Sequence, residues 1–312
     1  MRQKKATSIV VALIVTLLFW SSAFAGIRMG LRGYGPGELA LFRFAVASIV
    51  LFVYALFVGL RMPRPRDLPG ILVMGFLGFT VYHVGLNMGE VVVEAGAASF
   101  VIATVPIFST LLAVAFLRER LSWVGWLGML VSFAGVAIIS LGAGRHLRFE
   151  PSVLLIVAAA IGESLYFVLQ KPFLAHYSGL ELTTYTIWAG TLFMLVYLPG
   201  LIRELPSAPL GPSLAAVYLG IFPAALSYVL WSYALSKADV SRVTSTLNFT
   251  PLLSAAIAFV WLGEVLTPLT LAGGAVAIGG VIVLNRWGKA RSAPRGRRRS
   301  SRHSAADARR RG

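Results

Sequence analysis

The sequence predicts an all-α membrane protein with ten transmembrane helices, arranged as two inverted five-helix repeats. Three observations lead to this fold class. Of the 312 residues, 57% are hydrophobic and 13% are charged, and the mean hydropathy of +0.79 lies outside the usual range of soluble domains. Apolar stretches of about 20 residues, the length that spans about 30 Å of hydrocarbon, recur along nearly the whole chain. One segment also occurs twice.

Ten apolar stretches, separated by short polar connections, qualify as transmembrane helices. They are residues 7–27, 37–59, 69–89, 95–117, 122–142, 152–172, 181–201, 212–235, 239–262 and 267–285. The beginning of the first stretch resembles a signal peptide. However, Ser22-Ala23-Phe24 aligns with Ser164-Leu165-Tyr166 inside a later helix. This internal counterpart favours a retained helix, and the short connections leave no room for a soluble domain.

The repeated segment reads VPIFSTLLAVAFLRERLS from residue 105 and TPLLSAAIAFVWLGEVLT from residue 250. At a constant offset of 145 residues, the match pairs Pro106 with Pro251 and Glu119 with Glu264 without a gap. The chain therefore contains a duplicated module. We expect a first repeat at residues 1–145 and a second at 146–285.

The distribution of Lys and Arg predicts the orientation of the helices. If the amino terminus is cytoplasmic, the inner segments before the tail hold eleven basic residues and the outer segments hold five. Basic residues are retained inside, so we expect a multi-pass protein of the plasma (cytoplasmic, or inner) membrane with both termini in the cytoplasm. Five helices per module then insert the second module upside down, a construction that lets one central site open to either side.

The positive charge and the absence of cysteine limit the classes of partner and chemistry. No cysteine is present, so disulfides, thiolate metal sites and a cysteine nucleophile are excluded. Of the formal net charge of +16, residues 286–312 contribute +10, from eleven basic residues and Asp307. We expect this segment to be a disordered cytoplasmic tail near anionic lipid headgroups. No aromatic residue follows Trp287 to stack on bases, so nucleic acid is not an expected partner.

The duplicated module resembles the EamA-type permeases of the drug/metabolite transporter superfamily. The motifs that carry the resemblance are Trp20-Ser21-Ser22-Ala23-Phe24, Arg43-Phe44, Pro106 with Glu119-Arg120-Leu121, and Pro251 with Gly263-Glu264-Val265-Leu266. The resemblance covers about residues 7–285. It implies a ten-helix carrier of small metabolites, often an exporter, with a central cavity between the two halves. Arg43 has no basic counterpart in the second module.

Ionisable groups at membrane depth are costly, so each is a candidate functional residue. Glu163 lies near the middle of the sixth predicted helix, and Tyr166 and Gln170 follow it three and seven residues further along one face. We expect Glu163 to face the cavity and to bind a cationic substrate group or a coupling proton. The alternative is a glutamate that is hydrogen-bonded between helices and serves packing. Its counterpart in the first module is Ser21.

Arg43 lies about six residues, roughly 9 Å, inside the outer end of its helix. From this depth its side chain can reach either the surface or the cavity. His83 and Asn87 lie on one helical stripe with Glu90 and Glu94, at i, i+4, i+7 and i+11. The stripe leads from the predicted cavity toward an acidic outer mouth. A packed, hydrogen-bonded histidine is the alternative interpretation of His83.

Pro106 and Pro251 each free a backbone carbonyl, either to line the cavity or to shape the packing of a kinked helix. Asn248 precedes Pro251 on a polar stripe. Three aromatic residues are candidates for the wall of the substrate path: Trp20, Tyr228 and Trp231. Glu119 and Glu264 lie at membrane boundaries, where we expect helix caps or gate contacts. Glycine-rich stretches predict close helix contacts, either within a monomer or in a homodimer.

These features favour a secondary transporter of small metabolites, such as amino acids or related amphipathic compounds, that works by alternating access. A non-transporting membrane scaffold and an intramembrane enzyme are the alternatives. The deep charge of Glu163 argues against a scaffold. The sequence lacks an HExxH motif and a paired Asp motif, so it gives no support for an enzyme. We expect no cofactor and no metal. Because no nucleotide-binding loop is present, proton or substrate gradients remain as energy sources.

Overall fold

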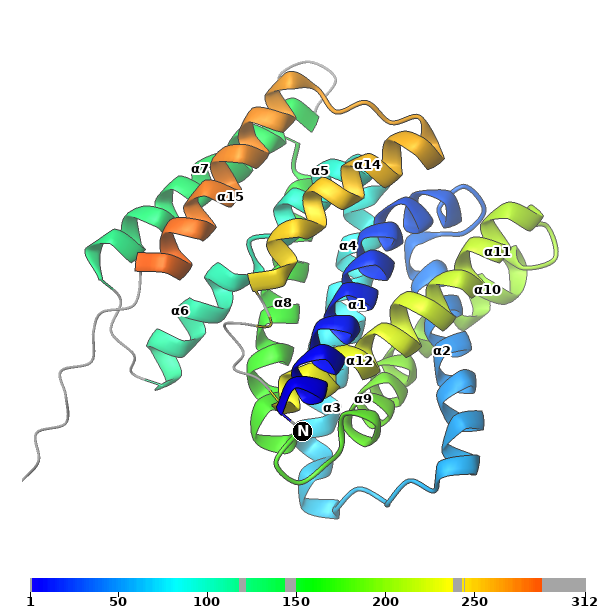
Figure 1. Cartoon of the computed structure of the whole chain (residues 1–312). Helices are drawn as coiled ribbons and strands as arrows, with labels where there is room; N and C mark the ends of the chain where they lie inside the picture. The colour runs from blue at the N-terminus through cyan, green and yellow to red at the C-terminus, as the bar shows by residue number, and fades with distance from the viewer. Residues whose placement is uncertain (1, 118–121, 144–149, 238–242, 244, 288–312) are drawn as a thin grey trace, which may run out of the picture.

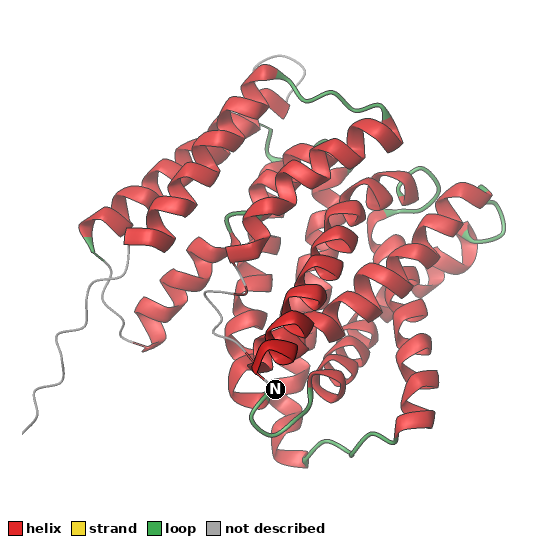
Figure 2. Ribbon diagram, in the orientation of Figure 1, coloured by secondary structure: helices red, strands yellow, loops and turns green. Residues whose placement is uncertain are grey.

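The computed structural model describes residues 2–117, 122–143, 150–237, 243 and 245–287. Within these ranges all regular secondary structure is helical, as Figures 1 and 2 show. The predicted all-α class is therefore confirmed. Glu119 and the tail from residue 288 onward lie outside the described residues.

The helices of the first half are α1 (Arg2–Gly30), α2 (Pro36–Val58), η1 (Pro65–Asp67), α3 (Leu68–Gly75), η2 (Phe76–Val81), α4 (Tyr82–Glu90), α5 (Ala95–Ile102), α6 (Val105–Leu117) and α7 (Trp123–Ala143). Those described in the second half are α8 (Ser152–Phe173), α9 (Gly179–Met194), η3 (Leu195–Tyr197), α10 (Leu198–Glu204), α11 (Leu210–Leu219), η4 (Gly220–Leu226), α12 (Ser227–Lys237), η5 (Ser245–Phe249), α14 (Thr250–Leu262) and α15 (Pro268–Trp287). Local sequence sets several boundaries. Ser178 and Glu181, for example, form a capping box that starts α9.

Seven helical stretches in the described part of the chain are long and apolar enough to cross a membrane. They are Ser8–Gly30, Pro36–Val58, Pro65–Glu90, Ala95–Leu112, Ser152–Phe173, Gly179–Glu204 and Leu210–Lys237. Three shorter apolar helices are Trp123–Ile139, Thr250–Leu262 and Pro268–Leu284. Each of these stretches overlaps one of the predicted spans. The fold is that of a multi-pass helical membrane protein.

Two kinds of irregular backbone occur in both halves. The segments η2 and η4 are π-helical and widen their helices at residues 76–81 and 220–226, about 145 residues apart. Helical breaks also correspond. The chain is interrupted at Ala103 and Thr104 before α6, which has Pro106 as its second residue, and it forms the 3-10 turn η5 before α14, which has Pro251 as its second residue.

The two halves pack against each other by exchanging equivalent contacts. Helix α1 packs against α12 and α14, while α8, the first helix of the second half, packs against α4 and α6. Helices α2 and α9 contact each other directly. Helices α7 and α15 run side by side at one edge of the bundle (Figure 1). This arrangement leaves the first, third and fourth helices of each half around the centre.

Candidate functional site

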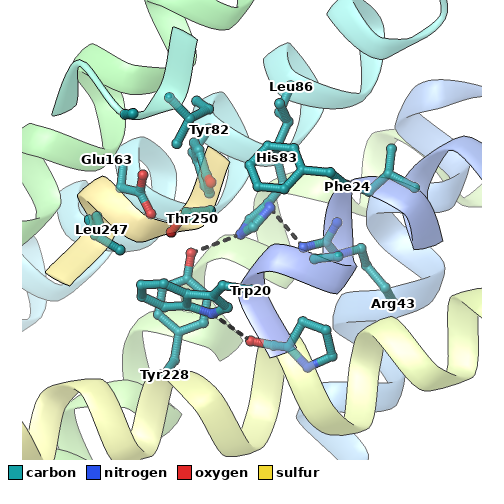
Figure 3. Close-up of a pocket in the computed structure, with 15 residues that line it drawn as sticks. Trp20, Phe24, Arg43, Tyr82, His83, Leu86, Glu163, Tyr228, Leu247 and Thr250 are labelled. Carbon is teal, nitrogen blue, oxygen red and sulfur yellow. Dashed lines mark hydrogen bonds between the residues drawn. The ribbon is translucent and has the colours of Figure 1, made fainter. Parts of the chain in front are cut away.

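A small cavity, with about 30 Å³ of space for water-sized molecules, lies among these central helices and α2 (Figure 3). Much of its wall is apolar: Ala23, Phe24, Ile27, Leu86, Ile102 and Leu247. Six polar or ionisable residues also line it: Arg43, Tyr82, His83, Glu163, Tyr228 and Thr250. An apolar wall with a few convergent polar groups is the usual composition of a small-molecule site. Residues from both halves of the chain contribute.

Arg43, His83 and Tyr228 form a hydrogen-bonded chain along one wall (Figure 3). The Arg43 Nη2 atom lies 2.9 Å from His83 Nδ1, and His83 Nε2 lies 3.1 Å from the Tyr228 hydroxyl. Arginine can only donate, so Nδ1 must accept, and the imidazole is neutral with its proton on Nε2. His83 therefore donates to the Tyr228 hydroxyl. Arg43, which the sequence allowed to reach the surface, is only 2% exposed.

Glu163 projects from α8 into the same cavity and is 3% exposed. Its carboxyl group lies within hydrogen-bonding reach of Tyr82 and points toward Thr250 in Figure 3. In that view His83 and Tyr228 lie between Glu163 and Arg43. The cavity thus holds an acidic and a basic side chain that do not pair with each other.

Trp20 connects α1 to the wide turn η4. Its indole Nε1 donates to the Pro223 carbonyl at 3.0 Å, and Thr16, one turn earlier, donates to the Ser227 carbonyl at 3.3 Å. The two contacts tie α1 to η4 and to the first residue of α12. The indole ring also packs against Tyr228, with ring centroids 5.0 Å apart. Trp20 is thereby fixed in the cavity wall.

Five other predicted site residues are buried but lie outside the lining of this cavity: Ser21, Asn87, Tyr166, Gln170 and Trp231. Asn87 donates to the Pro36 carbonyl at 2.9 Å, and Gln170 accepts from the Ser232 hydroxyl at 3.3 Å. Trp231 packs against Trp20, with centroids 4.9 Å apart. The backbone of Asn248 lies in η5, and its side chain is outside the described part of the structure.

Glu264 lies at one end of the bundle and joins three helices. Gly263 adopts a left-handed conformation (φ 69°) that ends α14, as glycine does at this position, and aims the next residue back at the bundle. One Glu264 oxygen lies 3.0 Å from Arg28 Nε, and the other accepts from the Ala95 backbone N–H at 3.0 Å. Arg28 also donates to the Glu90 carbonyl.

Glu94 lies between α4 and α5, near the Arg28–Glu264 ion pair. Burial raises the pKa of Glu94 above its usual value, and the nearby Glu264 carboxylate raises this pKa further, while Arg28 opposes the shift. The predicted acidic mouth therefore corresponds to a cluster of carboxyl groups around one arginine.

Two of the polar lining residues, Tyr82 and Thr250, are not among the site residues predicted from the sequence. Tyr82 precedes His83 and lies off the stripe that the histidine defines. Thr250 precedes Pro251 and therefore stands at the helical break itself. Proximity to a proline break is the signal that points to Thr250.

Comparison with known proteins agrees with this architecture. The model of the EamA-like transporter family matches residues 7–141 and again residues 150–286. The chain belongs to this family. The resemblance predicted from the sequence motifs is thus confirmed, and the EamA-like assignment identifies a membrane transporter with a small-molecule substrate.

Two relatives and one solved structure cover nearly the whole chain. A protein of Streptantibioticus cattleyicolor named "Probable terminal-alkyne amino-acid exporter" is 45% identical over 282 residues, which cover 90% of this chain and 95% of the relative. The "Uncharacterized transporter YdfC" of Bacillus subtilis is 42% identical over 279 residues, covering 89% and 91%. A protein crystal structure with 24% identity superposes with a TM-score of 0.62, covering 89% of this chain and 96% of that one, and so supports the fold.

Proposed function

We propose that this protein is a secondary transporter that exports small metabolites, such as amino acids or related amphipathic compounds. The observation that carries the proposal is the buried cavity, in which Arg43, His83, Glu163 and Tyr228 interrupt an apolar wall. Polar groups at that depth bind a compound with polar and apolar parts. The name of the Streptantibioticus cattleyicolor relative, an amino-acid exporter, favours both the compound class and the direction.

In the proposed mechanism, ten transmembrane helices form two inverted repeats, residues 1–145 and 146–285, which rock against each other around the cavity. The corresponding π-helical turns and proline breaks support this mechanism, because they place irregular backbone at equivalent points of both halves. Pro106 and Pro251 would then mark the moving segments, and the Arg28–Glu264 ion pair would close one end of the cavity. Both termini face the cytoplasm, and residues 286–312 form a cytoplasmic tail.

In this mechanism Glu163 supplies the coupling group. Its carboxyl reaches the cavity and has no basic partner among the described residues, so it is available for a proton or for a cationic part of the substrate. Tyr82 and Thr250 beside it can adjust their hydroxyl groups to either protonation state.

The experiment is a comparison of metabolites released by cells with and without the protein, followed by flux of the leading compound into proteoliposomes that contain the purified protein. We expect a gradient-dependent flux that empty liposomes lack. Correctly folded protein that moves no compound from the screen would favour the alternative of a membrane scaffold. Chemical conversion of the compound instead of its movement would favour an intramembrane enzyme.

A further inference from the structure

Arg43 is a buried cation without a counter-ion. Its side chain is 2% exposed, and no carboxylate of the described residues lies within ion-pair distance of it. Its Nε and Nη1 atoms are buried and have no hydrogen-bond partner. Arginine stays protonated in proteins, so the site cannot neutralise itself by releasing a proton. A buried charge of this kind needs an anion or further acceptors.

The surroundings position the guanidinium group without neutralising it. Nη2 donates to His83 Nδ1, and the neutral His83 donates its Nε2–H to the Tyr228 hydroxyl oxygen. The Phe44 ring lies 5.2 Å from Arg43 Cζ, in the range of a cation–π contact. These contacts fix the direction of the side chain, while its remaining donors stay available at the cavity wall.

Glu90 is the described carboxyl group whose charge acts on Arg43. It lies on the same helix as His83, but neither of its oxygens has a hydrogen-bond partner among the described residues, so it forms no hydrogen bond or ion pair with Arg43. Glu90 is also absent from the cavity lining. The unused donors of Arg43 are therefore not explained by the protein itself.

We propose that Arg43 binds the carboxylate of the transported substrate and that His83 and Tyr228 are positioning residues for this contact. The inference rests on the proposed transport function and narrows it to compounds with a carboxylate head. A carboxylate is the acceptor that a guanidinium binds best, through charge-assisted hydrogen bonds. The apolar wall formed by Phe24, Ile27, Leu86 and Leu247 then receives the aliphatic or aromatic body of the compound.

The test uses the purified full-length protein and isothermal titration calorimetry. A panel of neutral L-α-amino acids is screened, and the tightest binder is compared with its carboxamide and with its decarboxylated amine. We expect the wild-type protein to bind both carboxylate-free forms at least about tenfold more weakly than the amino acid, the loss expected for one hydrogen bond to a charged group. This comparison needs no variant and so does not depend on folding of a mutant.

Variants then assign the discrimination to Arg43. Arg43→Gln should bind the amino acid at least about tenfold more weakly and should no longer distinguish it from its carboxamide. Arg32→Gln, which removes an exposed cation from the turn after α1, is the charge control and should retain the discrimination. His83→Gln preserves an acceptor for Arg43 and a donor for Tyr228, so it should retain most of the discrimination, whereas His83→Ala should lose it.

Two results would overturn the inference. Equal affinity of the wild-type protein for the amino acid and its carboxamide is the first. The second is restoration of amino-acid binding to Arg43→Gln by an added Glu90→Gln change, because this would make Arg43 a structural counter-charge for Glu90. Reconstituted flux separates these results from failure of the proposed function. Transport of a compound without a carboxylate would contradict the proposed role of Arg43 but would still support the transport function. Absence of any flux would contradict both proposals.

Discussion

The two halves of the chain share their irregular backbone but differ in the side chains that face the cavity. The π-helical turns and the proline breaks recur at a spacing of about 145 residues. His83 and Tyr228 are also 145 residues apart, and these equivalent positions hydrogen-bond directly to each other. Arg43 and Glu163 have no charged counterparts. The comparison indicates that the two copies kept the same helical irregularities, while the side chains at the centre diverged.

The most decisive test of this comparison is whether the two halves have opposite orientations in the membrane. The chain lacks cysteine, so single Glu119→Cys and Glu264→Cys substitutions can be labelled in intact cells with a membrane-impermeant thiol reagent. Inverted halves predict labelling at 264 only, because positions 119 and 264 are equivalent ends of the two repeats. Permeabilised cells provide the control, in which both should react. Equal labelling of both positions in intact cells would contradict the inverted arrangement.

The next largest effect on transport should come from substitution of Glu163, which has no charged equivalent in the first half. Glu163→Gln keeps the shape and most hydrogen bonds but cannot exchange a proton. If Glu163 carries the coupling proton, pH-driven flux should fall at least about tenfold while substrate exchange persists. If it binds a cationic substrate group, binding itself should weaken. Flux and binding across pH, normalised to folded protein, separate the two roles.

Ser21 provides the matched control, because it is the counterpart of Glu163 in the first half and is also buried. Ser21→Ala should leave the pH profile unchanged. A Glu163→Gln protein with wild-type flux and pH profile would remove this residue from the mechanism. If Glu163→Ala lowers the yield of folded protein but leaves the turnover per folded molecule unchanged, Glu163 has a packing role instead.

Helical spans were largely predictable from the sequence because apolar length and polar punctuation determine them. The predicted span 152–172, for example, corresponds to the helix Ser152–Phe173. The widened turns η2 and η4 were not predicted, since an apolar stretch looks the same whether its hydrogen bonds reach four or five residues back. Pro223 is a local signal of the widened turn η4, because proline has no backbone N–H and cannot donate the regular α-helical hydrogen bond.

The site was harder to predict than the spans. Glu163, His83 and Trp20 line the cavity, since polar or amphipathic residues at membrane depth face the protein interior. Asn87 and Gln170 share stripes with them but are directed to other helices, because their position depends on which partner carbonyl or hydroxyl is close. Whether Arg43 reaches the surface or the interior likewise depends on contacts between helices, which no single-helix pattern contains.

The α7–α15 crossing allows the equivalence of the halves to be tested through stability. A Cβ atom on Gly280 would lie 2.4 Å from the Gly128 carbonyl oxygen, and one on the equivalent Gly135 would lie 2.3 Å from the Ala277 backbone nitrogen. Backbone atoms cannot move aside, so Gly280→Ala and Gly135→Ala should each destabilise the protein by about 1–3 kcal/mol. Thermal stability in detergent measures the loss.

Gly279 is the matched control for this prediction, because a Cβ atom there meets nothing within 4 Å. Gly279→Ala should be neutral, or stabilising by up to about 1 kcal/mol from helix propensity. A destabilised Gly279→Ala, or clearly unequal losses for Gly135→Ala and Gly280→Ala, would show that the crossing is less symmetric than the structure indicates.

The smallest expected effect concerns the contacts that Arg28 and Lys171 make with backbone carbonyls, and these contacts give the sharpest test of how far the two halves are equivalent. Arg28 donates to the Glu90 carbonyl at the end of α4, and Lys171 donates to the carbonyl of Leu235, the residue equivalent to Glu90, at 2.6 Å. If these contacts close opposite ends of the cavity, weakening them must shift the conformational equilibrium in opposite directions.

A single Thr250→Cys substitution in the cavity wall reports access from outside. Glu264→Gln, which breaks the ion pair with Arg28, should raise its labelling rate roughly two- to fivefold, the effect of a partly exposed ion pair. Lys171→Gln should lower this rate by a similar factor, and changes of the same sign would mean that the two contacts do not close opposite ends of the cavity.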